Sequence, residues 1–548
     1  MRSKFYKSWK FVLFLSVVAL YILFFSVLYR QEVKTFVDGW SRELLIAEIQ
    51  DLQTSDLMNI KNSYAVPIPE ENLFLSIWYA HESIHFSVIS ETGKILSTQR
   101  LEFAVPGSIR LEALRDEDNI YLYNLHNKIL YQYQFNWRTS QSMGEMTIAE
   151  DINALTALED TVIYGGEGGL FLYRKGMKTT PLIHESSILG VEATYDHQEK
   201  QYHMAFVEVQ EGLRFLKYGT YDGAFQSQPL STLPNQPTLT ISQLDLIKHA
   251  DNVHVILSTS NMKSNNAPII NYYSFDHKNP EQAEVFPIKI DSYAPNPMII
   301  GVDKLHLHFI ASEDIKKGRN TKVTNLVLYT MEKDRIISKH LLTNTEDTSL
   351  YPQYFKLNKN KYMQWTHLSG KSKSLYLASD HPEVVQATSK LKGDEWAKLL
   401  ADTLIGLIPI GFLALIPLMN IFLPVCLLLF LISVLKLTWM ENNANRVLPM
   451  AIGLHILLKI YYTVKNIINN EMLGDSMPWF LQSPMIIFLF ILFTTLVALY
   501  CAYDRQKKKN GHFFMTYTFF AVIDTLLYSL LFLPYFYTDL ILSYFTRL

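Results

Sequence analysis

Apolar residues gather at the two ends of the chain, and the long middle alternates between apolar and polar positions. Phe11 to Tyr29 is an apolar and aromatic run interrupted only by Ser16 and Ser26. Its length suits a helix that crosses a hydrocarbon core about 30 Å thick. No small-x-small cleavage pattern ends the run, so we expect an uncleaved signal anchor over residues 11–29 rather than a removed signal peptide.

Basic residues give this anchor a direction. Those that precede it are Arg2, Lys4, Lys7 and Lys10. The positive-inside rule keeps such a cluster in the cytoplasm, so we expect residues 1–10 to be cytoplasmic and residues 30–398 to lie outside the cell. Residues 30–71 then form a stalk, in which the apolar positions of Trp40–Ile60 have mostly helical spacing and predict a short amphipathic helix.

The helical period vanishes after about residue 72, and short runs of β-branched and aromatic residues follow up to about residue 390. These runs come in pairs separated by turn residues, as Val162–Gly166 and Leu170–Lys175 do. About seven such pairs occur, at intervals of about 40 to 57 residues. This spacing, with three or four strands per unit, is typical of β-propeller blades, each of which buries its apolar face against the next.

We therefore predict an all-β ectodomain over residues 72–390, folded as a β-propeller of about seven blades whose first and last units can combine to close the ring. Six or eight blades also fit the spacing, and one or two generic β-sandwiches are the alternative fold. The architecture resembles membrane-tethered bacterial propeller domains, although it lacks the Trp-Asp or Gly-Gly signatures of the best-known subfamilies. The resemblance rests on spacing alone and implies a propeller held at a cell surface.

Residues 391–548 are predominantly apolar and predict a C-terminal transmembrane helical bundle. The candidate spans lie near residues 412–437, 447–467, 484–502 and 513–534. The basic loop Arg505–Lys509 should face the cytoplasm, which with the anchor gives five spans. A helical hairpin within 399–437 that crosses twice is the alternative.

Three polar residues inside these spans are candidates for function, because charges are costly to bury in a membrane. Lys459 and Asp524 fall near the middle of their runs, and His455 precedes Lys459 by four residues, on the same helical face. We expect Lys459 and Asp524 to pair inside the bundle. In the alternative, Lys459 extends towards the membrane surface and Asp524 is protonated or faces water. A proton or ion path usually requires more spans and more polar residues than this block offers.

The segment from His81 to His85 matches H-E-x-x-H, the zinc-protease pattern, with Glu82 as the base. That chemistry needs a helix, so that His81 and His85 face one metal ion. Both flanks of the motif are strand-like, which favours a polar β-turn over a zinc site. Asp276–Asn279 is interpreted as another polar turn, and we expect no bound metal or cofactor.

Composition narrows the class of protein. The 49 Lys and Arg residues against 52 Asp and Glu residues leave no basic excess, so a nucleic-acid partner is not expected. The only cysteines, Cys426 and Cys501, lie in apolar runs, and no Asn-x-Ser/Thr acceptor occurs. A disulfide framework is thereby excluded, and a bacterial surface protein is favoured.

These patterns favour a non-enzymatic integral protein of the plasma membrane. Its propeller would serve as a binding, sensing or scaffold module for a protein or glycan partner at the cell envelope. The alternative is an enzyme, or an accessory subunit of a transporter, that acts on an envelope or lipid-linked substrate. That alternative predicts carboxylates that converge at the propeller axis, or a polar cavity among the C-terminal spans.

Overall fold

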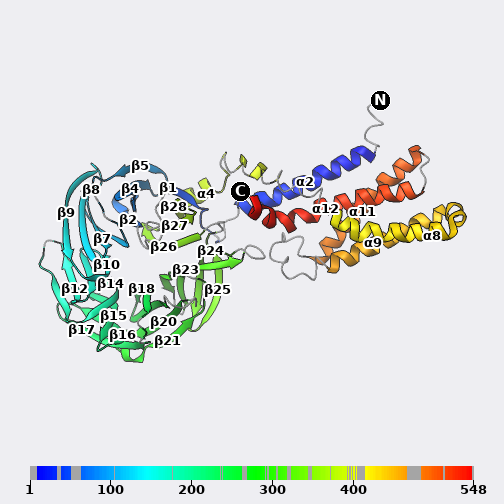
Figure 1. The fold of residues 1–548 in the computed structure, drawn as a ribbon. Coiled ribbons are helices and arrows are strands. Elements are labelled where there is room, and N and C mark those ends of the chain that lie inside the picture. Colours follow the sequence, from blue (N-terminus) through cyan, green and yellow to red (C-terminus); the bar gives the residue numbers. More distant parts are fainter. Residues whose placement is uncertain are drawn as a thin grey trace. The chain divides into compact units, whose positions relative to one another are not determined.

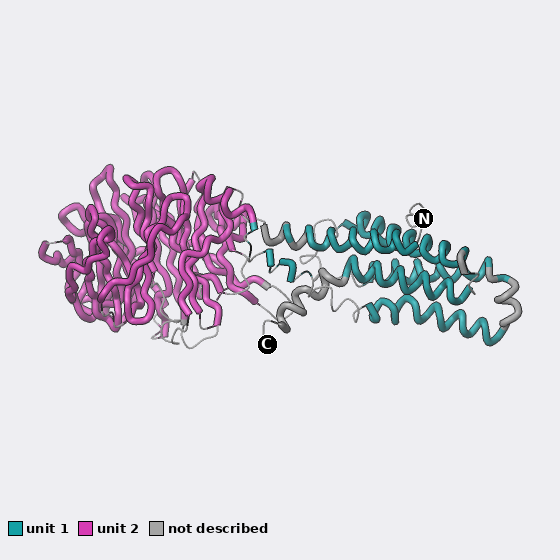
Figure 2. Tube along the Cα trace, turned by 90° about the horizontal axis from the view of Figure 1, so that it is seen from above, with its two compact units in different colours: residues 1–34, 391–548 teal, residues 35–390 magenta. Residues whose placement is uncertain are grey.

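The computed structural model divides the chain into two compact units, one of residues 1–34 and 391–548 and one of residues 35–390 (Figure 2). The residues that it describes are 9–33, 37, 39–50, 63–103, 105, 107–175, 177–234, 236, 238–261, 268–290, 292, 295–303, 306–316, 322–343, 348–370, 372–391, 393, 396–397, 399–401, 403, 414–465, 483–509 and 513–545.

The unit of residues 35–390 is a β-propeller of seven blades, each a four-stranded antiparallel sheet (Figure 1). Six blades take four consecutive strands each, from β2–β5 to β22–β25, and the last has the order β1-β28-β27-β26. The strands are β1 (Leu44–Ile49), β2 (Ser63–Ile68), β3 (Leu73–Ala80), β4 (Ser83–Ser90), β5 (Ile95–Arg100), β6 (Arg110–Asp116), β7 (Asn119–His126), β8 (Ile129–Asn136), β9 (Gln141–Ala149), β10 (Ile152–Leu158), β11 (Thr161–Gly166), β12 (Gly169–Arg174), β13 (Thr180–His184), β14 (Ser187–Asp196), β15 (Gln201–Gln210), β16 (Leu213–Tyr221), β17 (Phe225–Leu233), β18 (Leu239–His249), β19 (Asn252–Asn261), β20 (Ile269–Asp276), β21 (Glu284–Ile288), β22 (Met298–Asp303), β23 (His306–Lys316), β24 (Lys322–Glu332), β25 (Arg335–Leu341), β26 (Thr348–Leu357), β27 (Asn360–Ser369) and β28 (Ser372–Ser379).

The blades stack into a closed ring. The first strand of each blade contacts the first strand of the next, in the order β2, β6, β10, β14, β18, β22, β26 and back to β2. Apolar side chains fill the space between neighbouring blades; Phe86 of the first blade packs on Phe135 of the second, with ring centroids 5.2 Å apart. The buried apolar clusters of the propeller join residues of neighbouring blades, so much of its core lies between blades. Burying such a side chain contributes about 1.5–3 kcal/mol.

Two-residue hairpins with left-handed backbone connect several of these strands. Asn127 and Lys128 join β7 to β8 with φ angles of 48° and 65°. Positive φ at both central residues is the geometry of the turn that matches the twist of a β-hairpin. This local chemistry produces the paired strands on which the sequence-based prediction rests.

Strand β1 lies where the sequence predicts a stalk helix, so that prediction is wrong for residues 44–49. Leu44–Ile49 pairs with β28 as the outermost strand of the last blade, and Ile46 and Ile49 are buried in one cluster with Leu375 and Leu377. Pairing with the free edge of β28 outweighs the local helical spacing of the apolar positions. The predicted start of the propeller at residue 72 is also wrong, since β1 and β2 precede it; residues 51–60 of the expected helix lie outside the described residues.

Both ends of the propeller leave the ring at one face. Because strands within a blade are antiparallel, the hairpins between its first and second strands (residues 197–200, for example) and between its third and fourth strands lie at one face, here named the entry face. Hairpins such as residues 127–128 lie at the opposite face. The chain enters β1 and leaves β28 at the entry face, where Ser41 N–H donates to Ser379 O (2.7 Å) and Ser379 N–H donates to Ser41 Oγ (2.9 Å).

The other unit is helical. Its elements are α2 (Trp9–Val33), α7 (Leu415–Pro417), η3 (Leu418–Phe422), α8 (Leu423–Asn442), α9 (Ala444–Thr463), α11 (Pro484–Lys509) and α12 (Phe513–Phe545), while the short α4 (Pro382–Thr388) belongs to the propeller unit. One core joins α2 to helices from the far end of the chain, and it includes Phe24, Val425, Ile491 and Phe520. The N-terminal helix therefore packs within the C-terminal bundle.

In the described part of the chain, four helices are long and apolar enough to cross a membrane. These are Trp9–Ser26, Leu415–Leu435, Pro484–Lys507 and Phe513–Phe532. The span predicted near residues 447–467 forms α9, but α9 is not among the four. Arg446, His455 and Lys459 interrupt its apolar sequence. The described helices therefore provide one candidate span fewer than the five spans that the sequence predicts.

We predict that β1 is needed for a stable ring. Replacing Ile46, which is 5% exposed, with Ala should remove about 2–5 kcal/mol of stability, because it leaves a cavity between the first and last blades. The matched control is Leu45→Ala, since Leu45 is 40% exposed and lies beside Ile46 in the same strand. The measurement is the temperature at which the full-length protein in detergent loses its resistance to protease in the propeller. Equal losses for the two variants would contradict the packing of β1.

Candidate functional site

A charged cluster lies where the first strands of the blades line the ring. Arg110 begins β6, and its guanidinium binds Glu112 of the same strand (Nε–Oε1, 2.9 Å) and Glu192 of β14 (Nη2–Oε2, 3.1 Å). Thr156 of β10 donates to Glu192 Oε1 at 2.6 Å. Arg110 thus reaches two blades along, from the second to the fourth, and this is possible only on the inside of the ring. We name Arg110, Glu112, Thr156 and Glu192 the axial cluster.

The axial cluster carries one net negative charge, and its charged side chains have little exposure to solvent. Glu112 is 6% exposed, and Tyr64 on β2 lies close enough to be influenced by both carboxylates. Burial, together with the negative charges of Glu112 and Glu192, raises the pKa of Tyr64 well above its ordinary value. Tyr64 is therefore a neutral hydroxyl beside the cluster at physiological pH. Carboxylate, guanidinium and hydroxyl groups from four blades meet here.

The H-E-x-x-H segment lies in a hairpin. His81 and Glu82 form the turn between β3 and β4, with φ angles of 49° and 57°, and His85 lies on β4 with its ring stacked on Trp78 at a centroid distance of 5.8 Å. A turn does not align two histidines on one face as a helix does. The structure therefore does not assemble His81, Glu82 and His85 as a zinc-protease site.

The helical unit brings the three predicted polar residues together. Lys459 Nζ lies 2.7 Å from Asp524 Oδ1 and 2.9 Å from Asp524 Oδ2, and His455 Nε2 lies 3.1 Å from Asp524 Oδ2. All three residues are fully buried in the bundle. Lys459 thus points into the bundle rather than towards its ends.

Two threonines of α11 complete this helical polar cluster. Lys459 Nζ donates to Thr494 Oγ1 (2.9 Å) and Thr495 Oγ1 (3.1 Å), and Tyr517 Oη lies 3.3 Å from His455 Nδ1. With these bonds the ammonium and the carboxylate are both satisfied, which a buried ion pair requires. The sequence did not single out these hydroxyl groups, because single threonines and tyrosines are common in apolar helices.

Three further residues whose side chains can bind a metal ion lie close together, and the sequence did not single them out. One ligand atom each from Asp196, Glu199 and His203 lies within 4.8 Å of the others, across the hairpin between β14 and β15. Their spacing, D-x-x-E-x-x-x-H, is typical of no single metal site. The only signal was the concentration of acidic and histidine residues in one hairpin.

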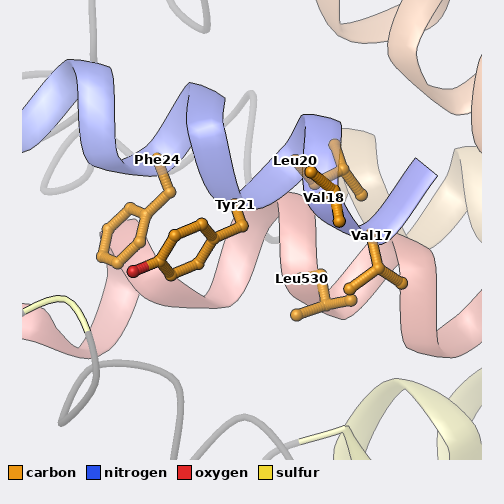
Figure 3. A pocket seen from close by; sticks show the side chains of 6 residues that line it. All are labelled: Val17, Val18, Leu20, Tyr21, Phe24 and Leu530. Atoms are coloured by element: carbon orange, nitrogen blue, oxygen red, sulfur yellow. The ribbon is translucent and has the colours of Figure 1, made fainter. Parts of the chain in front are cut away.

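The helical unit also carries an apolar pocket of about 170 Å³ between α2 and α12. Figure 3 shows its lining, which is Val17, Val18, Leu20, Tyr21, Phe24 and Leu530. The Tyr21 hydroxyl is the one polar side-chain group in this lining. Such a surface suits a hydrocarbon chain and offers little for catalysis.

No protein-family model matches the chain, and no curated protein matches it. Solved structures resemble parts of the chain at low identity. The Dos1 propeller is 11% identical, with a TM-score of 0.40, over 61% of this chain and 94% of that chain. The polysaccharide lyase Uly1 is 8% identical, with a TM-score of 0.40, over 64% and 94%. A Trypanosoma rangeli sialidase is 10% identical, with a TM-score of 0.36, over 65% and 61%. These likenesses concern the fold alone, and the count of seven blades rests on the sheets of this chain.

We predict that the Lys459–Asp524 pair behaves as a unit. Lys459→Met should lower stability by about 3–5 kcal/mol, because it leaves the Asp524 carboxylate buried without its cation. The double variant Lys459→Met with Asp524→Leu should recover most of that loss, since no charge is then stranded. The measurement is the fraction of full-length protein that stays monodisperse in detergent after heating. A double variant no more stable than the single one would show that the pair is not coupled.

Proposed function

We propose that the chain is a multi-pass plasma-membrane protein, of bacterial type, that presents its propeller outside the cell as a non-enzymatic binding module. One apolar helix precedes the propeller and three follow it. The basic residues that precede Phe11 and those of Arg505–Lys509 favour a cytoplasmic side for both segments. This arrangement would place the propeller, between Arg30 and the C-terminal helices, on the outer side.

The observation that carries the proposal is that both chain connections of the propeller lie side by side at the entry face, joined by the Ser41 and Ser379 hydrogen bonds. The opposite face therefore carries no connection to the helices. Loops of a rigid ring are a common place for ligand recognition. We infer that the opposite face receives the partner, a protein or a glycan of the envelope.

Ion pairs between neighbouring blades occur at both faces. At the entry face, ion pairs link neighbouring blades, and they include Glu70 with Arg115, Glu71 with Arg138, Asp116 with Lys175 and Asp196 with Lys248. Several of these groups are also exposed, among them Glu70 at 57% and Asp116 at 52%. At the opposite face, Lys128 and Glu167 are 53% and 58% exposed although they pair at 2.6 Å. An exposed pair of this kind contributes little to stability, so little free energy is lost when a partner separates its two charges.

The first test concerns topology. In a variant without Cys426 and Cys501, a cysteine at Lys128 should react with a membrane-impermeant maleimide on intact cells, because the opposite face would be outside. A cysteine at Lys507 should react only after the cells are permeabilised, since the positive-inside rule places that loop in the cytoplasm. Labelling of the two sites in the reverse order, or of both from one side, would contradict the proposed orientation.

The second test locates the partner. A photo-crosslinking amino acid at Glu211, in the β15–β16 hairpin of the opposite face, should capture one abundant partner on intact cells. The matched control is Gln226, which is exposed on the outermost strand of the same blade. Crosslinks at Gln226 equal to those at Glu211 would argue against recognition by the opposite face.

One observation favours the second candidate function, an enzyme or transport accessory subunit acting on an envelope substrate: Glu112 and Glu192 converge on Arg110 inside the ring. Cell-wall glycans and lipid-linked precursors, incubated with the full-length protein in detergent, provide the test. Turnover by the wild type that Glu112→Gln abolishes, with the fold retained, would support this enzyme. Absence of turnover by the wild type would leave the binding module as the better reading.

A further inference from the structure

The junction of the fourth and fifth blades gathers two carboxylates and two imidazoles at the entry face. Asp196 ends β14, Glu199 lies in the hairpin that follows, and His203 lies on β15, all in the fourth blade. His277 comes from the fifth blade, directly after β20. We name these four residues the junction cluster. It shares no residue with the axial cluster, although Asp196 and Glu192 both lie on β14.

The distances from Glu199 to the two imidazoles are close to those between the ligands of a common metal ion. His203 Nε2 lies 3.7 Å from Glu199 Oε2, and His277 Nε2 lies 3.4 Å from Glu199 Oε1. Two ligand atoms that are each about 2.0–2.2 Å from a tetrahedral zinc ion lie roughly 3.4 Å apart. The rings of His203 and His277 are nearly perpendicular, at 86°, with centroids 5.8 Å apart. Both histidines thus direct their Nε2 atoms to the same carboxylate.

His203 gives an independent sign of a missing ligand. The residue is fully buried, and its Nε2 atom has no hydrogen-bond partner among the described residues. Its other nitrogen, Nδ1, lies 2.5 Å from the hydroxyl of Tyr218. With Nδ1–H donating to that hydroxyl, Nε2 offers its lone pair to the cluster. A buried nitrogen left without a partner is costly, and a metal ion would satisfy it.

The surrounding hydrogen bonds orient the other ligands in the same way. His277 Nδ1 donates to Asp251 O at 2.9 Å, which turns Nε2 towards Glu199. Asp196 Oδ1 accepts the backbone N–H of Gln198 at 2.7 Å, and Oδ2 is left for the cluster. Metal-bound histidines generally donate their second ring N–H to a carbonyl or carboxylate.

Lys248 occupies the cluster in the structure. Its ammonium binds Asp196 Oδ2 and Glu199 Oε2, the latter at 3.0 Å. A dication in the same place would gain more from the two carboxylates than this single charge does. The long lysine stem allows the ammonium to move outwards when the metal binds.

We propose that Asp196, Glu199, His203 and His277 form a binding site for a divalent transition-metal ion of the zinc class, from which Lys248 is displaced. Two imidazoles favour zinc over magnesium or calcium, which prefer oxygen ligands alone. Four protein ligands close the coordination sphere, as in structural rather than catalytic zinc sites. Since three ligands come from the fourth blade and one from the fifth, the ion would join the two blades.

The test is zinc binding by the full-length protein in detergent after treatment with a chelator. Zinc retained after desalting is measured by mass spectrometry, and Co²⁺ absorption in the visible range reports tetrahedral ligation. The wild type should bind one ion at this site, and His277→Gln should bind it more than roughly tenfold more weakly. Lys248→Met should bind zinc more tightly than the wild type, because the competing cation is gone.

The matched control is His197→Ala. His197 lies in the same hairpin, but it is 77% exposed and pairs with Glu159 instead. This variant should bind zinc as the wild type does. Misfolding cannot produce the tighter zinc binding that is expected for Lys248→Met. Tighter binding therefore distinguishes a metal site from a network of side chains that only stabilises the fold. Equal zinc binding by the wild type, Lys248→Met and His277→Gln, or no binding by any of them, would overturn the proposal.

Discussion

The closure of the ring by β1 is the contact on which the propeller depends. Each blade has two faces that must be covered, and the last blade also needs a fourth strand along the edge of β28. An uncovered edge leaves a row of backbone N–H and C=O groups open to pairing with other chains. The six residues Leu44–Ile49 meet both needs, because they pair with β28 and place Ile46 and Ile49 between the last and first blades. Each of the other propeller strands already has its own position in a blade, so none of them can replace β1.

The helical unit depends on a different constraint, the cost of charge in an apolar bundle. Lys459 and Asp524 are both fully buried, and they persist there because each satisfies the other together with Thr494, Thr495 and His455. Apolar residues of similar size would pack as well without such demands. These contacts therefore join α9, α11 and α12 to one another inside the bundle.

The sequence predicts those parts of the structure that follow from local patterns. Alternating runs around two-residue turns identify the blades, and the strand-like flanks of His81–His85 identify a hairpin. Lys459 and Asp524 both lie near the middle of their apolar runs, and these positions were enough to predict that the two residues meet. The helix expected over Trp40–Ile60 was wrong for residues 44–49, because the partner strand lies at the other end of the propeller sequence and no local pattern records it.

The sites that the sequence did not predict are those made by ring order. Arg110 and Glu192 meet because the second and fourth blades both face the axis, and His277 reaches Glu199 because the fifth blade follows the fourth. Neither contact can be recognised from the spacing of residues in the sequence. The number of candidate spans differs from the prediction because the polar residues that assemble the bundle also make α9 less apolar than the four candidate helices.

The placement of β1 also sets an order of events during biosynthesis. The strand that leaves the ribosome first belongs to the blade that is finished last, so its hydrogen-bonding edge waits without a partner until β28 has been made. Contacts so distant in sequence are slow to form. Ring closure is therefore a late event, and any chain that is interrupted before Ser379 leaves an open ring whose two exposed edges invite capture by chaperones or proteases.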